Sequence, residues 1–66
     1  MKKIIISEKI KSYRKENRIT QEEFGCIMGV SAQAVSKWEK ELCYPDITFL
    51  PSLAVALGCG IDDFFT

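Results

Sequence analysis

The stretch QEEFGCIMGVSAQAVSKWEK, residues 21–40, decides the fold of this chain, because it predicts two short helices joined by a tight turn. Gly29 stands at the corner, where a glycine adopts a positive φ at little cost. Thr20 and Glu23 have the spacing of a capping box before the first helix, and Ser31 is expected to cap the second. Apolar residues occupy the positions at which two such helices face a common core: Phe24, Met28, Val30, Val35 and Trp38.

A helix-turn-helix unit has this arrangement of caps, glycine and apolar positions, and in DNA-binding proteins its second helix enters the major groove. The sequence here resembles the lambda-repressor/Cro-like helix-turn-helix family of bacterial and phage regulators. The resemblance starts at about Ile10 and covers KIKSYRKENRITQEEF, VSAQAVSKWEKELCYPDI and LAVALGCGIDDFF, which together make up most of the chain. It implies an all-α, compact five-helix domain that binds double-stranded DNA.

The remaining helices follow from apolar spacing and from proline and glycine. Ser7 is expected to cap a helix that runs to about Asn17, with apolar residues four and seven positions apart on one face. Thr48 is expected to cap a helix that holds Pro51 in its first turn and ends at Gly58. A last short helix is expected over residues 61–65. Gly25 has no side chain, so we expect the two helices of the helix-turn-helix unit, residues 21–40, to approach closely there.

Length and composition predict one domain over residues 1–66, with a short lead at 1–6 and no effector-binding domain. A 66-residue chain with 47% hydrophobic residues can form a single small core. No apolar run approaches the length of a membrane span, and MKKIII is too short for a secretory signal, so a cytoplasmic protein is expected. No cofactor is expected.

The cysteines, Cys26, Cys43 and Cys59, are widely spaced, and the chain has no histidine. Zinc would need a further ligand, and one disulfide would leave a thiol unpaired. Reduced thiols and no metal site are therefore expected, while a redox role for Cys26 or Cys43 stays open.

The net charge is zero, but the charge is unevenly distributed. Residues 1–20 hold seven basic and two acidic residues, whereas residues 41–66 hold four acidic residues and none that are basic. A fold that turns the N-terminal half toward phosphates would use this asymmetry. Ordinary solvated helix faces would explain the same pattern.

Base reading is expected from the outward face of the second helix of the unit. Gln33 is the strongest candidate, because its amide can pair with N7 and N6 of adenine through a donor and an acceptor. Ser36 and Lys37 lie one turn further on and can reach a base or a phosphate. Ala32 offers only a methyl group, which suits a thymine methyl or a close approach.

Phosphate contacts are expected from the starts of the two helices and from the end of the second. The resemblance implies this role for Gln21 and Ser31, where free amides and the helix dipole favour an anion. Lys40 is a further candidate. Weaker candidates lie on the first helix or follow it: Lys11, Lys15 and Arg18.

The resemblance also implies an internal ion pair between Arg14 and Glu39, which would fix the second helix of the unit against the first helix of the chain. We therefore assign both residues to structure and not to DNA. A partly buried pair of this kind favours one geometry more than it adds stability.

Together these features predict a sequence-specific regulator of transcription that reads an inverted repeat as a homodimer. A repressor is expected. The C-terminal region is the candidate dimer surface, with Phe49, Phe64 and Phe65. The two last phenylalanines can equally close the core of a single subunit.

Two other classes of function compete with this interpretation. A protein-interaction module with the same fold, antitoxin-like or a co-regulator partner, would use the apolar side chains of Cys26 and Ile27. An enzyme is not expected, because the chain has no histidine, no paired carboxylates in a plausible cleft and no glycine-rich phosphate loop.

Overall fold

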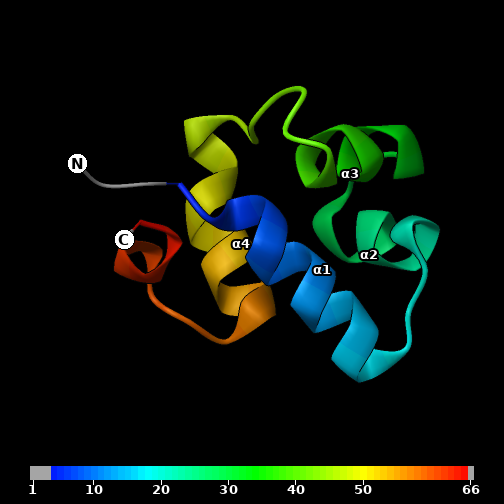
Figure 1. Cartoon of the computed structure of the whole chain (residues 1–66), viewed down its shortest axis with the longest axis horizontal. Helices are drawn as coiled ribbons and strands as arrows, with labels where there is room; N and C mark the ends of the chain where they lie inside the picture. Colours follow the sequence, from blue (N-terminus) through cyan, green and yellow to red (C-terminus); the bar gives the residue numbers. More distant parts are fainter. Residues whose placement is uncertain (1–3, 66) are drawn as a thin grey trace.

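The computed structural model describes residues 4–65, which form four α-helices and two short 3-10 helices around one core (Figure 1). The all-α class is as expected, but the number of α-helices is four and not five. The elements, in chain order, are α1 (Ile6–Asn17), α2 (Gln21–Met28), α3 (Ala32–Glu39), η1 (Ile47–Phe49), α4 (Leu50–Leu57) and η2 (Ile61–Phe64).

The start of α1 is set by a tertiary contact and not by the serine cap expected from sequence. The helix begins at Ile6, and the amide of Ile5 donates a hydrogen bond to the carbonyl of Phe64 at 2.8 Å. Ser7 is buried inside the first turn, and its hydroxyl donates to Glu41 Oε1 at 3.0 Å. The expectation that Ser7 caps this helix is therefore wrong.

The start of α2 and the turn between α2 and α3 have the capping interactions and the glycine conformation expected from the sequence. Thr20 and Glu23 form a reciprocal capping box, and Gly29 has a φ of 75°. A Cβ atom on Gly25 would lie 2.6 Å from the carbonyl oxygen of Val30, so this glycine lets the turn pack against α2. The close approach is to the backbone of the turn, and any side chain at position 25 would push it away.

The entry to α4 differs from the sequence-based expectation. Thr48 does not cap α4; it lies inside η1, where Asp46 accepts hydrogen bonds from its amide at 3.0 Å and its hydroxyl at 3.1 Å. Pro51 lies in the first turn of α4, as its missing N–H requires. Gly58 ends the helix with a φ of 69°, which confirms the expected stop.

The C-terminal segment folds back as the 3-10 helix η2 and not as a further α-helix. Phe64 is completely buried, so it belongs to the core of the single chain and not to a dimer surface. Phe65 stays partly exposed and forms an isolated antiparallel bridge with Ile4. The N- and C-terminal segments thus meet on the side of the molecule opposite α3 (Figure 1).

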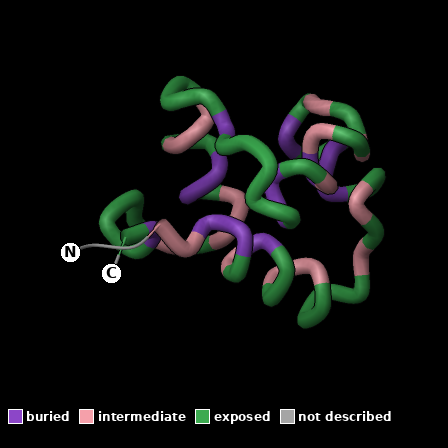
Figure 2. The backbone as a smooth tube through the Cα atoms, turned by 45° about the horizontal axis from the view of Figure 1, so that its top comes forward, coloured by how far each residue is buried: buried purple, intermediate pink, exposed green. Residues whose placement is uncertain are grey.

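The core lies where α1, α2, α3 and α4 meet, and their buried segments face one another (Figure 2). Its buried hydrophobic members come from all four α-helices and from η2: Ile6, Ile10, Phe24, Met28, Val35, Trp38, Leu53, Ala54 and Phe64. Within residues 4–65, no helix is long and apolar enough to cross a membrane.

Candidate nucleic-acid interface

Helix α3 has one buried face and one exposed face. Val35 and Trp38 are buried, at 0% and 5% exposure, and fix the inner face to the core. Positions 33, 36, 37 and 40 fall on the other face, because residues three and four apart are neighbours on a helix. Gln33, Lys37 and Lys40 are exposed there, and Ser36 is half-buried.

These four outward residues surround a shallow hollow of about 370 Å³. Its remaining wall is Leu42, which follows the end of α3 and is 71% exposed. The structure thus brings Gln33, Ser36, Lys37 and Lys40 together at one surface. Ala32 is half-buried and does not line the hollow.

The start of α3 is formed by a side-chain cap. Ser31 Oγ accepts a hydrogen bond from the amide of Ala34 at 3.2 Å, and Ser31 itself is exposed. The expected cap is therefore present. The first amides of α3 and the positive end of its dipole are directed outward beside Ser31, where an anion is favoured.

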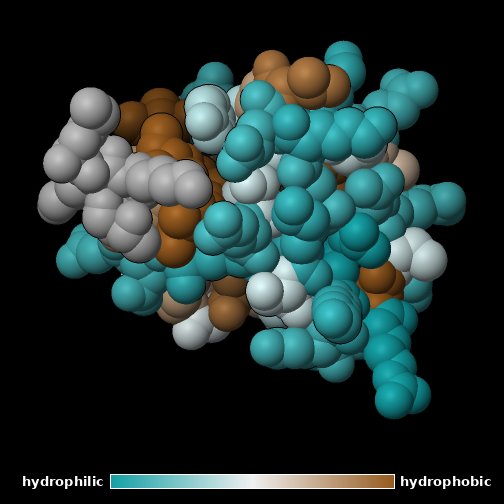
Figure 3. All heavy atoms as spheres, viewed as in Figure 1, coloured by the Kyte–Doolittle hydropathy of each residue, from teal (hydrophilic) through white to brown (hydrophobic). Residues whose placement is uncertain are grey.

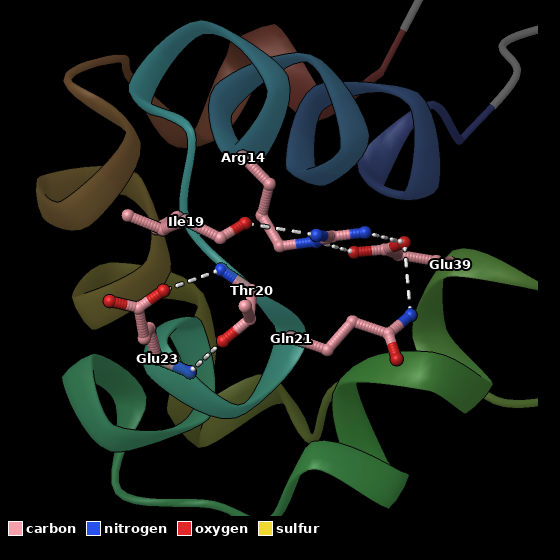
Figure 4. A network of polar contacts seen from close by, with 6 residues as sticks. All are labelled: Arg14, Ile19, Thr20, Gln21, Glu23 and Glu39. Atoms are coloured by element: carbon pink, nitrogen blue, oxygen red, sulfur yellow. Dashed lines mark hydrogen bonds and ion pairs between the residues drawn. The ribbon is translucent and has the colours of Figure 1, made fainter.

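Arg14 of α1 and Glu39 of α3 form a two-pronged ion pair across the interior of the unit (Figure 4). Arg14 Nε donates to Glu39 Oε2 at 2.6 Å, and Arg14 Nη2 donates to Glu39 Oε1 at 2.9 Å. Arg14 Nη1 also donates to the carbonyl of Ile19 at 3.0 Å. The guanidinium therefore joins α1, the α1–α2 connection and α3.

The electrostatics of this pair follow from its burial and its partners. Burial alone would raise the pKa of Glu39, but hydrogen bonds from Arg14 and Gln21, with the charges of Arg14 and Lys11, lower that pKa below its ordinary value. The hydrogen bond to Glu39 raises the pKa of Arg14. Both groups are thus held in their charged forms.

Gln21, a candidate for a phosphate contact, takes part in the same network. Its Nε2 donates to Glu39 Oε1 at 3.3 Å, which leaves one N–H of the amide available (Figure 4). The helix that starts at Gln21 is capped by Thr20 and presents its dipole at that end. Gln21 therefore connects the interior ion pair with the surface at the start of α2.

The other basic candidates and the thiols lie at the surface. Hydrophilic residues cover most of the face over α1, α2 and α3, while hydrophobic ones gather over α4 (Figure 3). Lys11, Lys15 and Arg18 are exposed, and Arg18 ends α1 in the left-handed conformation. Cys26 and Cys43 are exposed, and no cluster of three metal-ligating residues occurs within residues 4–65.

The apolar candidates for a partner surface separate into packed and exposed residues. Phe49 packs against Trp38, with the ring centroids 6.1 Å apart, so its ring belongs mainly to the subunit. Ile27 is 54% exposed on α2. The most exposed apolar side chains near α4 are Ile47 at 77% and Val55 at 83%, and neither was predicted as a functional residue from the sequence.

Comparison with known proteins gives the family. Residues 10–64 match the helix-turn-helix family, so the chain belongs to that family. The repressor protein C2 of Salmonella phage P22 is 36% identical over 58 residues, which are 88% of this chain. The chain spans about a quarter of the length of that relative, 27%.

Solved structures agree with this assignment. The P22 c2 repressor in complex with a synthetic operator has a TM-score of 0.80 at 36% identity, with 89% of both chains covered. The N-terminal DNA-binding domain of SinR from Bacillus subtilis has a TM-score of 0.75 at 30% identity, covering 91% of this chain and 88% of that one. The all-α helix-turn-helix fold is therefore confirmed.

Proposed function

We propose that this chain acts as a sequence-specific DNA-binding transcriptional repressor, which reads an operator in double-stranded DNA through the major groove. The observation that carries the proposal is the exposed face of α3. Gln33, Lys37 and Lys40 stand out from a helix whose opposite face is fixed in the core. A rigid helix with free polar side chains on one face is what base reading needs.

Gln33 is assigned to a base. It is exposed in the first turn of α3, the part of a recognition helix that contacts base edges. Its amide offers a bidentate pair to adenine that discriminates by about 1–3 kcal/mol. Ser36 and Lys37, one turn further along the same face, are assigned to neighbouring bases, and Ala32 to a close approach at the helix start.

Phosphate contacts are assigned to the ends of the two helices. Ser31 and the first amides of α3 form one site, and the free N–H of Gln21 at the start of α2 forms another. Lys40 supplies a cation at the far end of α3. Contacts at both ends of α3 would fix the register of Gln33 along the groove.

The ion pair between Arg14 and Glu39 supports this function indirectly. Because Glu39 lies in the last turn of α3 and Arg14 in α1, the pair holds α3 at one angle to the rest of the domain. Gln21 shares the carboxylate of Glu39, so the start of α2 is coupled to the same geometry. We assign Arg14 and Glu39 to positioning and not to contact with DNA.

Homodimerisation is part of the proposal, because one short recognition helix covers only a few base pairs. The C-terminal half remains the candidate dimer surface, but the residues assigned to that surface differ from those expected from the sequence. Phe65 is partly exposed and Phe49 half-buried, whereas Phe64 is excluded by its burial. The exposed side chains of Ile47 and Val55 are additional candidates.

A second candidate function is a protein-interaction module with the same fold. The exposed Ile27, with Cys26 beside it on α2, is the observation that favours it. Such a module would not depend on the phosphates of DNA. The salt dependence of binding therefore distinguishes the two functions, since each phosphate contact releases counterions.

The test is selection of binding sites from random duplex DNA at two salt concentrations. Wild type, Gln33→Ala and the control Ser52→Ala, an exposed position on α4, are compared. We expect wild type and the control to enrich the same inverted repeat, with one half-site position losing its preference in Gln33→Ala. Weak binding without enrichment would contradict the proposal and favour a protein partner.

A further inference from the structure

The C-terminal end of α3 has a defined backbone geometry. The amide of Glu41 donates to the carbonyl of Trp38 at 3.2 Å, and the amide of Leu42 donates to the carbonyl of Lys37 at 3.0 Å. Glu41 has a φ of 61°. These two hydrogen bonds and the left-handed residue between them form a Schellman motif.

Glu41 is an unusual residue for this place, because the left-handed conformation costs a non-glycine residue about 1 kcal/mol. Its carboxylate accepts a hydrogen bond from the buried hydroxyl of Ser7 at 3.0 Å. That bond connects the end of α3 to the first turn of α1. The backbone that leads into Leu42 is therefore held to both α3 and α1.

Leu42 is directed to the recognition surface and not to the core. It is 71% exposed, and it closes the hollow that Gln33, Ser36, Lys37 and Lys40 form. An exposed leucine by itself is ordinary. Ile47 is as exposed, at 77%, but does not line the hollow, so position and not exposure distinguishes Leu42.

We propose that Leu42 is a specificity-determining residue that contacts the C5 methyl group of a thymine in the operator. This inference rests on the proposed function, since it needs α3 in the major groove. There the thymine methyl is the apolar group by which a base pair is recognised. The polar residues of the hollow would bring the leucine to the groove, and the side chain would shield that methyl from water.

The test removes single methyl groups from the DNA. In the operator obtained by selection, each thymine is replaced in turn by deoxyuridine, which lacks only the C5 methyl, and affinity is measured by fluorescence anisotropy. At one thymine of each half-site, wild type should bind about threefold to tenfold more weakly after replacement, the scale of one buried methyl group. Leu42→Ala should show no loss there.

Two control variants and one internal control keep the result specific. Leu42→Met retains an apolar side chain and should keep the sensitivity to that methyl. Ile27→Ala removes an exposed apolar side chain of α2 that lies outside the hollow and has no part in the proposed DNA binding or dimerisation, and it should keep the whole wild-type profile. Any thymine read by Ala32 at the other end of α3 should stay sensitive in Leu42→Ala.

The possible outcomes separate this inference from the proposed function. If wild type binds its operator and Leu42→Ala has an unchanged methyl profile, the role of Leu42 is wrong while the repressor function stands. If wild type enriches no duplex sequence, the proposed function fails, and the role of Leu42 fails with it. Circular dichroism of each variant checks that the exposed substitutions leave the fold intact.

Discussion

The two faces of α3 differ in what their side chains contact. On the inner face, Val35 and Trp38 are buried and Glu39 is held by Arg14. On the outer face, Gln33 and Lys37 are exposed. Eight residues of helix thus combine a fixed side with a free side. The difference indicates that changes on the inner face should affect stability, and changes on the outer face should affect binding.

The largest effect is expected from Trp38→Ala on the inner face. Removing a buried tryptophan destabilises a protein by about 3–5 kcal/mol, because the cavity is only partly refilled. A domain of 66 residues has a total stability of about 3–10 kcal/mol, so much of the variant should be unfolded. Urea denaturation followed by circular dichroism measures the loss, with Lys37→Ala as the outer-face control. Equal losses in both variants would contradict the division into faces.

Arg14→Ala should have the next largest effect, about 2 kcal/mol. It leaves the carboxylate of Glu39, whose side chain is 6% exposed, without its main partner. We expect this variant to lose more thermal stability than Lys37→Ala. Substituting both members with Leu should restore part of the loss, since no uncompensated charge stays buried. A loss for Arg14→Ala no larger than for Lys37→Ala would refute the structural assignment.

The same ion pair should make stability depend on pH. The stability lost on protonation of Glu39 should be no larger than the stability lost in Arg14→Ala. The pKa of Glu39 is lowered in the fold, so the unfolded chain binds its proton first, and stability falls as the pH drops below about 4.5, the ordinary value. In Glu39→Gln this part of the acid loss should be absent. Urea midpoints of the two proteins between pH 7 and pH 3 test it; a constant difference over that range would contradict the prediction.

A smaller effect is expected at the start of α3. Ser31→Ala removes the N-cap of α3, the hydrogen bond that Ser31 Oγ accepts from the amide of Ala34, and should cost about 1 kcal/mol of stability. Because Ser31 is also assigned to a phosphate, its operator binding should weaken and the salt dependence should decrease. Thr20→Ala, which removes the equivalent cap of α2, is the matched control for stability. If both variants bind the operator equally well, the phosphate role of Ser31 is wrong.

The smallest effect on stability is expected from Gln33→Ala, at most about 0.5 kcal/mol, because the side chain is exposed. Its effect on base preference should be the largest of the outer-face variants. Urea denaturation of the protein used in the binding-site selection checks this. A clear loss of stability would mean that Gln33 belongs to the scaffold as well.

Sequence predicted the central unit well because its signals are local. Thr20 caps α2 by accepting a hydrogen bond from the amide of Glu23, three residues later, and Gly29 adopts a positive φ because it is a glycine. Neither feature depends on distant parts of the chain. The starts of α1 and α4 were predicted wrongly. The start of α1 depends on a hydrogen bond from the amide of Ile5 to Phe64, near the far end of the chain. Thr48 is bound by Asp46 within η1, so it does not cap α4. A partner as distant in sequence as Phe64 is not apparent from the residues around Ile5, whereas Asp46 is a local partner that competes with the predicted capping role of Thr48.

The candidate site shows the same limit. Helical spacing placed Gln33 and Lys37 on one face, which needed only the period of the helix. Leu42 received no role, because its position depends on Glu41, and a glutamate does not signal a left-handed residue as a glycine would. The burial of Phe64 was left open, since it is decided by how η2 folds back onto α1 and α4.

The meeting of residues 4 and 65 has a consequence for how the chain could be rewired. Ile4 pairs with Phe65, and the amide of Ile5 donates to the carbonyl of Phe64. The described polypeptide is thus nearly a closed ring, and a short linker could join its ends on the side opposite α3. New ends opened between the exposed Cys43 and Tyr44 would give a circular permutant with the same core.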